Sequence, residues 1–142
     1  MNQQTEILFE QKNIDKAANQ FLKLTDGYKI FAFSGELGAG KTTFINALCQ
    51  QLQIEEAATS PTYSIIQEYH TKNGDIVYHM DLYRLKDTEE ALDAGVEDCL
   101  ESGNICMVEW PEKALDIFPE QTIFSTFNLL DMRTRKLNVI IP

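Results

Sequence analysis

The distribution of apolar and polar positions predicts a regular succession of strands and helices. Residues 28–34 form a largely apolar run of strand length, as expected for a strand buried inside a sheet. After a glycine-rich turn, apolar residues recur at helical spacing: Phe44, Ile45, Leu48 and Leu52. Ahead of this unit, residues 5–10 are expected to form a strand. The apolar positions between 14 and 22 predict a helix with Asn13 as its N-cap.

The second half of the chain is expected to contain two hairpins. The pair Asn73-Gly74 separates two apolar-rich runs, 63–70 and 76–82, which is a strong hairpin signal. Three further apolar runs predict strands, the last two of them paired as a closing hairpin: 104–110, 122–130 and 136–140.

A helix is predicted between the two hairpins. Asp87 and Glu90 have the form of a capping box that opens it. We expect the helix to continue through Leu92 and Val96 and to end at Gly103.

The turn after residues 28–34 carries the clearest chemical signal. Its residues match the phosphate-binding loop, G-x-x-x-x-G-K-[ST]: Gly35-Glu36-Leu37-Gly38-Ala39-Gly40-Lys41-Thr42. Glycines allow successive backbone N–H groups to point at phosphate oxygens, and the helix start adds the positive end of its dipole. Lys41 is expected to reach the β- and γ-phosphates, and Thr42 to place its hydroxyl on Mg²⁺.

The predicted fold is a three-layer α/β/α P-loop NTPase fold with a mixed, mainly parallel sheet, because hairpins add antiparallel strands to a parallel core. At 142 residues the chain is expected to form a single domain, 1–142. A nucleotide-binding sheet with its covering helices uses nearly all of that length. Little length remains for a second domain, so we expect the process that the nucleotide drives to take place partly on another protein.

The charge and the cysteine content argue against several classes of protein. The formal net charge is −10, with 22 acidic and 12 basic residues. Such a surface repels nucleic acid and anionic membranes, so no direct nucleic-acid binding is expected. The three cysteines form no C-x-x-C pair, which argues against a disulfide framework or a zinc ribbon. No signal peptide or bilayer-spanning apolar run is recognisable, and a cytoplasmic location is expected.

Two carboxylates follow apolar strands and could serve a metal site. Asp81 lies near the end of the run 76–82, and Glu109 lies near the end of the run 104–110. P-loop proteins hold Mg²⁺ with an acidic residue in such a position. Asp81 could equally cap the chain or pair with Arg84. Glu109 is suited either to contact Mg²⁺ through water or to orient the attacking water, and the residues leave the division of roles open.

A hydroxyl-rich loop and the single tryptophan are further candidates. The loop includes Ser60, Pro61, Thr62 and Tyr63. In nucleotide switches a threonine in this place reaches the γ-phosphate, although an ordinary Ser/Thr/Pro turn that enters a strand is the simpler interpretation. Trp110 could stack, cover the site or anchor an interface, or only pack beside the following helix.

Three other residues are not expected to act in the site. A lone strand histidine such as His79 is more often a packed, hydrogen-bonded residue than a ligand. Arg133 and Arg135 could touch the nucleotide, but a solvated turn is the simpler interpretation.

Four blocks in order resemble the TsaE family, also called YjeE: G-E-L-G-A-G-K-T-T, S-P-T-Y, Y-H-M-D-L-Y-R-L and V-E-W-P. These are small bacterial P-loop ATPases required for the threonylcarbamoyladenosine (t6A) modification of tRNA. The likeness spans about residues 28–111, and no block lacks a functional group.

The resemblance implies a set of site residues and partners. ATP or ADP is expected to bind at Gly35, Glu36, Leu37, Gly38, Ala39, Gly40, Lys41, Thr42 and Thr43. Mg²⁺ binding is implied for Thr42 and Glu109, with Asp81 also serving the metal, and residues 60–63 are implied to form a switch-like loop. Trp110 matches the tryptophan that the family has near its site. The implied partners are the TsaD transferase subunit and its paralogue TsaB. Hydrolysis by the chain alone is expected to be slow, since no arginine is obviously placed as a finger.

Two alternatives use the same loop. A small-molecule kinase needs an acceptor pocket and usually mobile arginines that cover the transferring phosphoryl group. This chain has only three arginines, Arg84, Arg133 and Arg135, and little spare length for such a pocket. A GTPase-type switch needs a guanine-reading N/T-K-x-D motif, which Thr71-Lys72-Asn73-Gly74 does not match. A nucleotide competition assay separates these alternatives.

Overall fold

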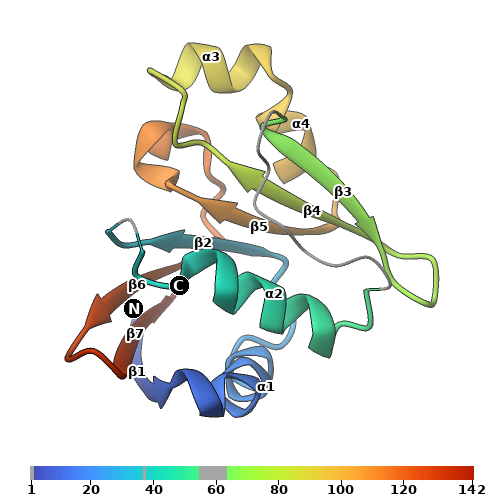
Figure 1. Ribbon diagram of the computed structural model, residues 1–142. Coiled ribbons are helices and arrows are strands. Elements are labelled where there is room, and N and C mark those ends of the chain that lie inside the picture. Colours follow the sequence, from blue (N-terminus) through green and yellow to red (C-terminus); the bar gives the residue numbers. More distant parts are fainter. Residues whose placement is uncertain (1, 37, 55–63) are drawn as a thin grey trace.

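The computed structural model describes residues 2–36, 38–54 and 64–142. Its strands form one seven-stranded sheet in the order β1-β7-β6-β2-β5-β4-β3 (Figure 1). The strands are β1 Gln3–Glu10, β2 Ile30–Ser34, β3 Ile66–His70, β4 Ile76–Asp81, β5 Ile105–Glu109, β6 Ile123–Leu129 and β7 Thr134–Ile141. Both predicted hairpins are present, as β3–β4 and β6–β7.

The centre of the sheet is parallel and its edges are antiparallel. β2 pairs in parallel with both β5 and β6, and β4 pairs in parallel with β5. The pairs β1–β7, β6–β7 and β3–β4 are antiparallel. The expected α/β fold with a mixed sheet is therefore confirmed. The carboxyl ends of β2, β4, β5 and β6 lie at one edge, where ligands bind in open α/β sheets.

Two apolar clusters cover opposite faces of the sheet. Helices α1 Ile14–Leu24 and α2 Lys41–Gln51 pack on the face that carries Phe31 and Phe33. The short helices α3 Thr88–Asp93 and α4 Val96–Leu100 pack on the face that carries Ile30 and Val108. The described residues also form three 3₁₀ turns: η1 Gln11–Asn13, η2 Pro111–Lys113 and η3 Leu115–Ile117.

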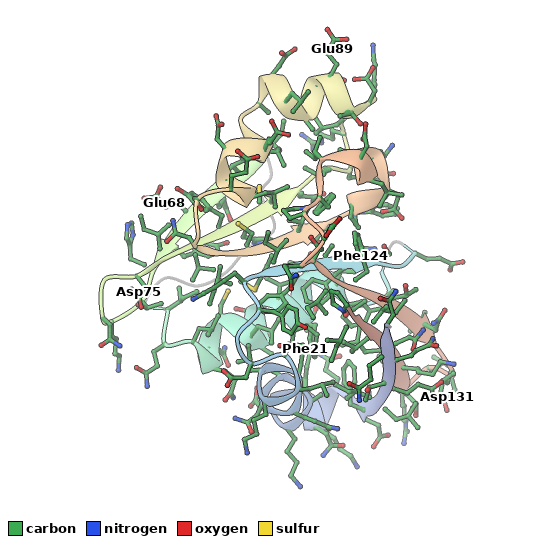
Figure 2. All side chains as sticks on the ribbon, turned by 180° about the vertical axis from the view of Figure 1, so that it is seen from behind. Phe21, Glu68, Asp75, Glu89, Phe124 and Asp131 are labelled. Carbon is green, nitrogen blue, oxygen red and sulfur yellow. The ribbon has the colours of Figure 1, made fainter. Side chains whose placement is uncertain are left out.

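The first cluster is rich in aromatic rings. Phe21 of α1 lies between that helix and the sheet, with its ring centroid 5.3 Å from Phe31 and 5.7 Å from Phe44 (Figure 2). Phe44 in turn lies 5.4 Å from Phe127 of β6. These contacts fix the start of α2 against β2 and β6.

The prediction of a single helix from residue 87 to residue 103 is wrong, because this segment forms two short helices, α3 and α4. Asp87 caps α3, accepting a hydrogen bond from the Glu90 backbone N–H at 3.0 Å. The chain then breaks at Gly95, whose φ of 90° lies in the left-handed region, and resumes as α4. Glycine allows this break at little steric cost. Among the described residues, no helix is long and apolar enough to cross a membrane.

Candidate active site at the carboxyl end of the sheet

The glycine-rich turn connects β2 to α2 through three glycines with positive φ. The angles are 146° at Gly35, 79° at Gly38 and 104° at Gly40. A Cβ atom at Gly35 would also lie 3.1 Å from both the Cβ and the carbonyl oxygen of Phe127. Gly35 is therefore required for the close approach of the turn to β6. Leu37, predicted to belong to this loop, lies outside the described residues.

Lys41 begins α2 and is 5 % exposed. Its ammonium donates hydrogen bonds to the backbone carbonyls of Gly35 and Glu36. It also lies 4.1 Å from the ring centroid of Trp110, a favourable cation–π distance. Burial lowers the pKa of Lys41, and the nearby carboxylates, chiefly Glu109, oppose that shift.

Thr42 and Glu109 are brought together from separate elements. The Thr42 hydroxyl donates a hydrogen bond to Glu109 Oε1 at 2.9 Å. Glu109 is 3 % exposed, and Asp81 stands opposite it in the register of β4 and β5. Asp81 Oδ1 accepts the Tyr83 backbone N–H at 3.0 Å, so its predicted capping role is present.

These side chains surround one pocket of about 240 Å³. It is lined by Gly38, Gly40, Lys41, Thr42, Thr43, Asp81, Tyr83, Glu109 and Trp110. The hydroxyl and the two carboxylates are hard oxygen donors of the kind that Mg²⁺ prefers. Within the described part of the chain, no three His, Cys, Asp or Glu side chains group as a metal site. The donor set fits Mg²⁺ shared with a substrate, because this ion commonly takes only one or two protein carboxylates.

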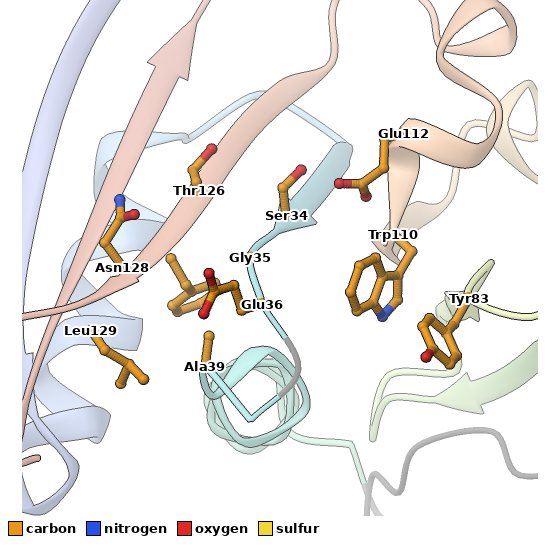
Figure 3. A pocket seen from close by; sticks show the side chains of 11 residues that line it. Ser34, Gly35, Glu36, Ala39, Tyr83, Trp110, Glu112, Thr126, Asn128 and Leu129 are labelled. Carbon is orange, nitrogen blue, oxygen red and sulfur yellow. The ribbon is translucent and has the colours of Figure 1, made fainter.

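Trp110 lines both this pocket and a larger one of about 680 Å³, which is shown in Figure 3. Its φ of 60° lies in the left-handed region, and Pro111 begins η2 directly after it. The Tyr83 ring lies 4.9 Å from the Trp110 ring, and both residues line the two pockets. In Figure 3 the Glu36 and Glu112 side chains lie around the larger pocket.

Arg135 lies closer to the glycine-rich turn than the sequence analysis favoured, although it was named there as able to touch the nucleotide. It lies on β7 and helps to line a pocket of about 220 Å³ beside Gly38, Gly40 and Thr43. The expectation of a solvated turn is wrong for Arg135, because the β6–β7 hairpin folds back beside the P-loop. Nothing in the local sequence marks this, since more than 90 residues separate the two segments. Residues 60–63 lie outside the described residues.

Comparison with known proteins places the chain among its relatives. A family model described as "Threonylcarbamoyl adenosine biosynthesis protein TsaE" matches residues 8–137. The chain belongs to the TsaE family.

Relatives in the TsaE family come from distant bacteria. The chain is 41 % identical over 123 residues to TsaE of Borreliella burgdorferi, covering 85 % of this chain and 88 % of the relative. It is 38 % identical to TsaE of Haemophilus influenzae, covering 82 % and 73 %. Both relatives are described as tRNA threonylcarbamoyladenosine biosynthesis proteins. The chain therefore belongs to a family whose members are named for a tRNA modification.

The TsaE family's fold is also seen in a solved structure. The crystal structure of Bacillus subtilis YdiB matches with a TM-score of 0.69 at 23 % identity, covering 99 % of this chain and 87 % of YdiB. At this identity the likeness shows the shared fold.

Proposed function

We propose that the chain is a Mg²⁺-dependent ATPase that serves t6A modification of tRNA by acting on the TsaB–TsaD complex in the cytoplasm. The observation that carries this proposal is the contact between Thr42 and Glu109, 2.9 Å apart in the pocket that Lys41 also lines. A phosphate-binding lysine, a metal-binding hydroxyl and an acidic residue are the recurring parts of P-loop hydrolysis.

Each residue has a role that follows from its position. Lys41 binds phosphate oxygens as a buried cation, and the backbone N–H groups at the start of α2 orient them. Thr42 supplies a metal-binding hydroxyl, while Asp81 and Glu109 supply carboxylates beside it. Bound Mg²⁺ would neutralise charge on the phosphates. Glu109 also lies near enough to Thr42 to orient a water molecule in the same pocket.

Nucleotide binding is expected to change the surface around Trp110. The Trp110 ring now covers the Lys41 ammonium at 4.1 Å. A phosphate bound by Lys41 competes with that contact, because both need the same cation. Movement of the ring would alter the lining of both pockets, and this would couple nucleotide binding to the outer surface.

The rim of the larger pocket suits a protein partner. Leu129 on β6 is 48 % exposed and Tyr83 is 44 % exposed, and both line this pocket. Exposed tyrosines are among the residues enriched as anchors in interfaces, and Leu129 adds apolar surface beside Tyr83. An acidic chain with such a rim is better suited to the proteins that hold the tRNA than to the tRNA itself.

The positions of the arginines also support a hydrolysis rate that depends on a partner protein. None of the three arginines lines the pocket that holds Lys41 and Glu109, as far as the described residues go. An arginine supplied by a partner can raise hydrolysis by about three to five decades. The isolated chain is therefore expected to turn over slowly.

The test is ATP hydrolysis by the purified chain, alone and with TsaB and TsaD, with Mg²⁺ or with EDTA. We expect a slow Mg²⁺-dependent rate that rises when both partners are added. A rapid rate that partners do not change would argue against partner gating. A phosphorylated small molecule as the product would favour a kinase instead.

A further inference from the structure

A buried histidine lies directly behind Glu109. His79 on β4 is 0 % exposed, and its Nε2 atom lies 2.8 Å from Glu109 Oε2. Its other ring nitrogen, Nδ1, lies 3.1 Å from the Tyr69 hydroxyl oxygen, and that oxygen lies 2.5 Å from Gln67 Oε1. Four side chains from three adjacent strands are thus joined in one hydrogen-bonded chain.

Strand alternation explains why these groups meet. Side chains two residues apart point to the same face of a sheet, so His79 shares a face with Asp81, and Gln67 with Tyr69. In the sheet register, Gln67 stands opposite His79 and Asp81 stands opposite Glu109. Val77 and Tyr69 of this face belong to the apolar cluster under α2. A polar row therefore crosses an apolar layer and ends at the candidate active site.

The direction of each hydrogen bond follows from the chemistry of Glu109. A carboxylate only accepts hydrogen bonds. The Thr42 hydroxyl donates to Oε1, so the His79 contact at Oε2 requires a proton on Nε2. Nδ1 then faces the Tyr69 hydroxyl, whose single proton can be donated either to Nδ1 or to Gln67 Oε1.

We infer that His79 is a positioning residue for Glu109. The terminal torsion of a glutamate side chain is broad, so one hydrogen bond from Thr42 leaves the plane of the carboxylate loosely defined. A second bond from a rigid, fully buried ring at Oε2 holds that plane and keeps Oε1 toward Thr42. Tyr69, itself bonded to Gln67, holds the ring of His79. The kinetic consequence rests on the proposed hydrolytic role of Glu109.

Buried packing alone would predict a different pattern of variants. If His79 only filled volume, leucine, which has a similar volume, would replace it well and glutamine would bring no benefit. If it positions Glu109, glutamine should be the better substitute, because its amide N–H can donate from nearly the place of Nε2. The exposed His70, which lies 3.2 Å from Glu68, is a matched control on the neighbouring strand.

Steady-state hydrolysis with the partners present separates these patterns. We expect His79→Leu to lower kcat by about 10- to 100-fold, as for other residues that orient a ligand, with the KM for ATP within about threefold of the wild type because the P-loop is untouched. His79→Gln should recover most of the rate, Tyr69→Phe should lose part of it, and His70→Gln should lose none. Equal rates for His79→Leu and His79→Gln would overturn the inference.

A nucleotide-free measurement tests the hydrogen bond itself. In protein labelled with ¹⁵N-histidine, long-range proton–nitrogen NMR spectra identify which ring nitrogen of His79 carries a proton. We expect a proton on Nε2 in the wild type and a shifted Nε2 resonance in Glu109→Gln, and thermal unfolding of each variant checks that it is folded. An Nε2 atom without a proton would overturn the inference even if His79→Leu failed to fold. Absence of ATP hydrolysis in the wild type would overturn the proposed function while leaving this spectrum to decide the contact.

Discussion

Lys41 occupies an unusual environment for a charged side chain. Its ammonium is held by two backbone carbonyls and the Trp110 ring. These groups partly compensate for the loss of water around a charge, and the charge is thereby retained near the phosphate-binding loop. The ammonium group of Lys41 is therefore already held beside the phosphate-binding loop before an anion binds.

Substitution of Lys41 and substitution of Glu109 are expected to affect nucleotide binding and turnover differently. Lys41→Ala should weaken nucleotide binding by about 10- to 100-fold, since it removes charge-assisted hydrogen bonds, and should lower turnover as well. Glu109→Ala should keep nucleotide binding but lower kcat by about two to four decades. Calorimetric titration with ADP and single-turnover hydrolysis measure the two effects. Equal loss of binding in both variants would refute the division.

The lowered pKa of Lys41 predicts an alkaline limit to nucleotide binding. Only the protonated amine attracts phosphate, and burial moves its deprotonation below the ordinary pKa of 10.5. Nucleotide affinity should therefore fall as the pH rises, beginning below 10.5. Titrations of ADP binding between about pH 7 and 10 check this. Lys41→Arg is the control, since a guanidinium stays charged throughout; an identical pH profile in both proteins would contradict the prediction.

At the scale of elements, the loop between β2 and α2 depends on its contact with β6. Gly35 combines a positive φ with a contact that leaves no room for a Cβ atom against Phe127. Gly103 also has a positive φ, of 83°, but a Cβ atom there would meet nothing within 4 Å. Both glycines therefore have a positive φ, but an added Cβ atom would be crowded only at Gly35.

Gly35→Ala should disturb the site, whereas Gly103→Ala should only lower stability. For Gly103→Ala we expect a loss of about 1–2 kcal/mol in the free energy of unfolding, the ordinary cost of a left-handed residue, with unchanged ADP affinity. Gly35→Ala should cost more and weaken ADP binding about tenfold or more, because the P-loop must move away from β6. Urea unfolding and ADP titration measure both, and unchanged ADP affinity in Gly35→Ala would count against the role of this contact.

At the scale of the whole molecule, charge governs what the surface attracts. The net charge is −10, and acidic side chains such as Glu68, Asp75, Glu89 and Asp131 lie around its outside (Figure 2). Long-range repulsion disfavours a polyanion over most of this surface.

The isolated chain is therefore expected not to bind tRNA at physiological salt. Gel-shift or anisotropy measurements with tRNA should show no salt-dependent complex, whereas the TsaB–TsaD complex should recruit both the chain and the tRNA. Addition of tRNA without these proteins should leave ATP hydrolysis unchanged. A tRNA complex of the isolated chain whose affinity falls steeply with salt would show a direct phosphate contact.

The amino-acid sequence by itself determined the local parts of this protein. Glycine spacing, apolar runs and turn residues act within a few positions, so they predicted the P-loop, β2, α2 and both hairpins. Periodicity could not show that Gly95 would break the helix after Asp87, because a glycine inside a helical pattern is tolerated at a modest cost. The carboxylates at 81 and 109 were candidates only because each follows an apolar strand.

Only the tertiary structure decided which of these parts meet. Strand order sets β4 beside β5, and this places Asp81 next to Glu109 and His79 behind it. The same order folds β7 back so that Arg135 lies beside the P-loop. Contacts between residues far apart in the chain depend on how strands pair and on which faces are buried. A sequence pattern with a range of a few residues carries no such information.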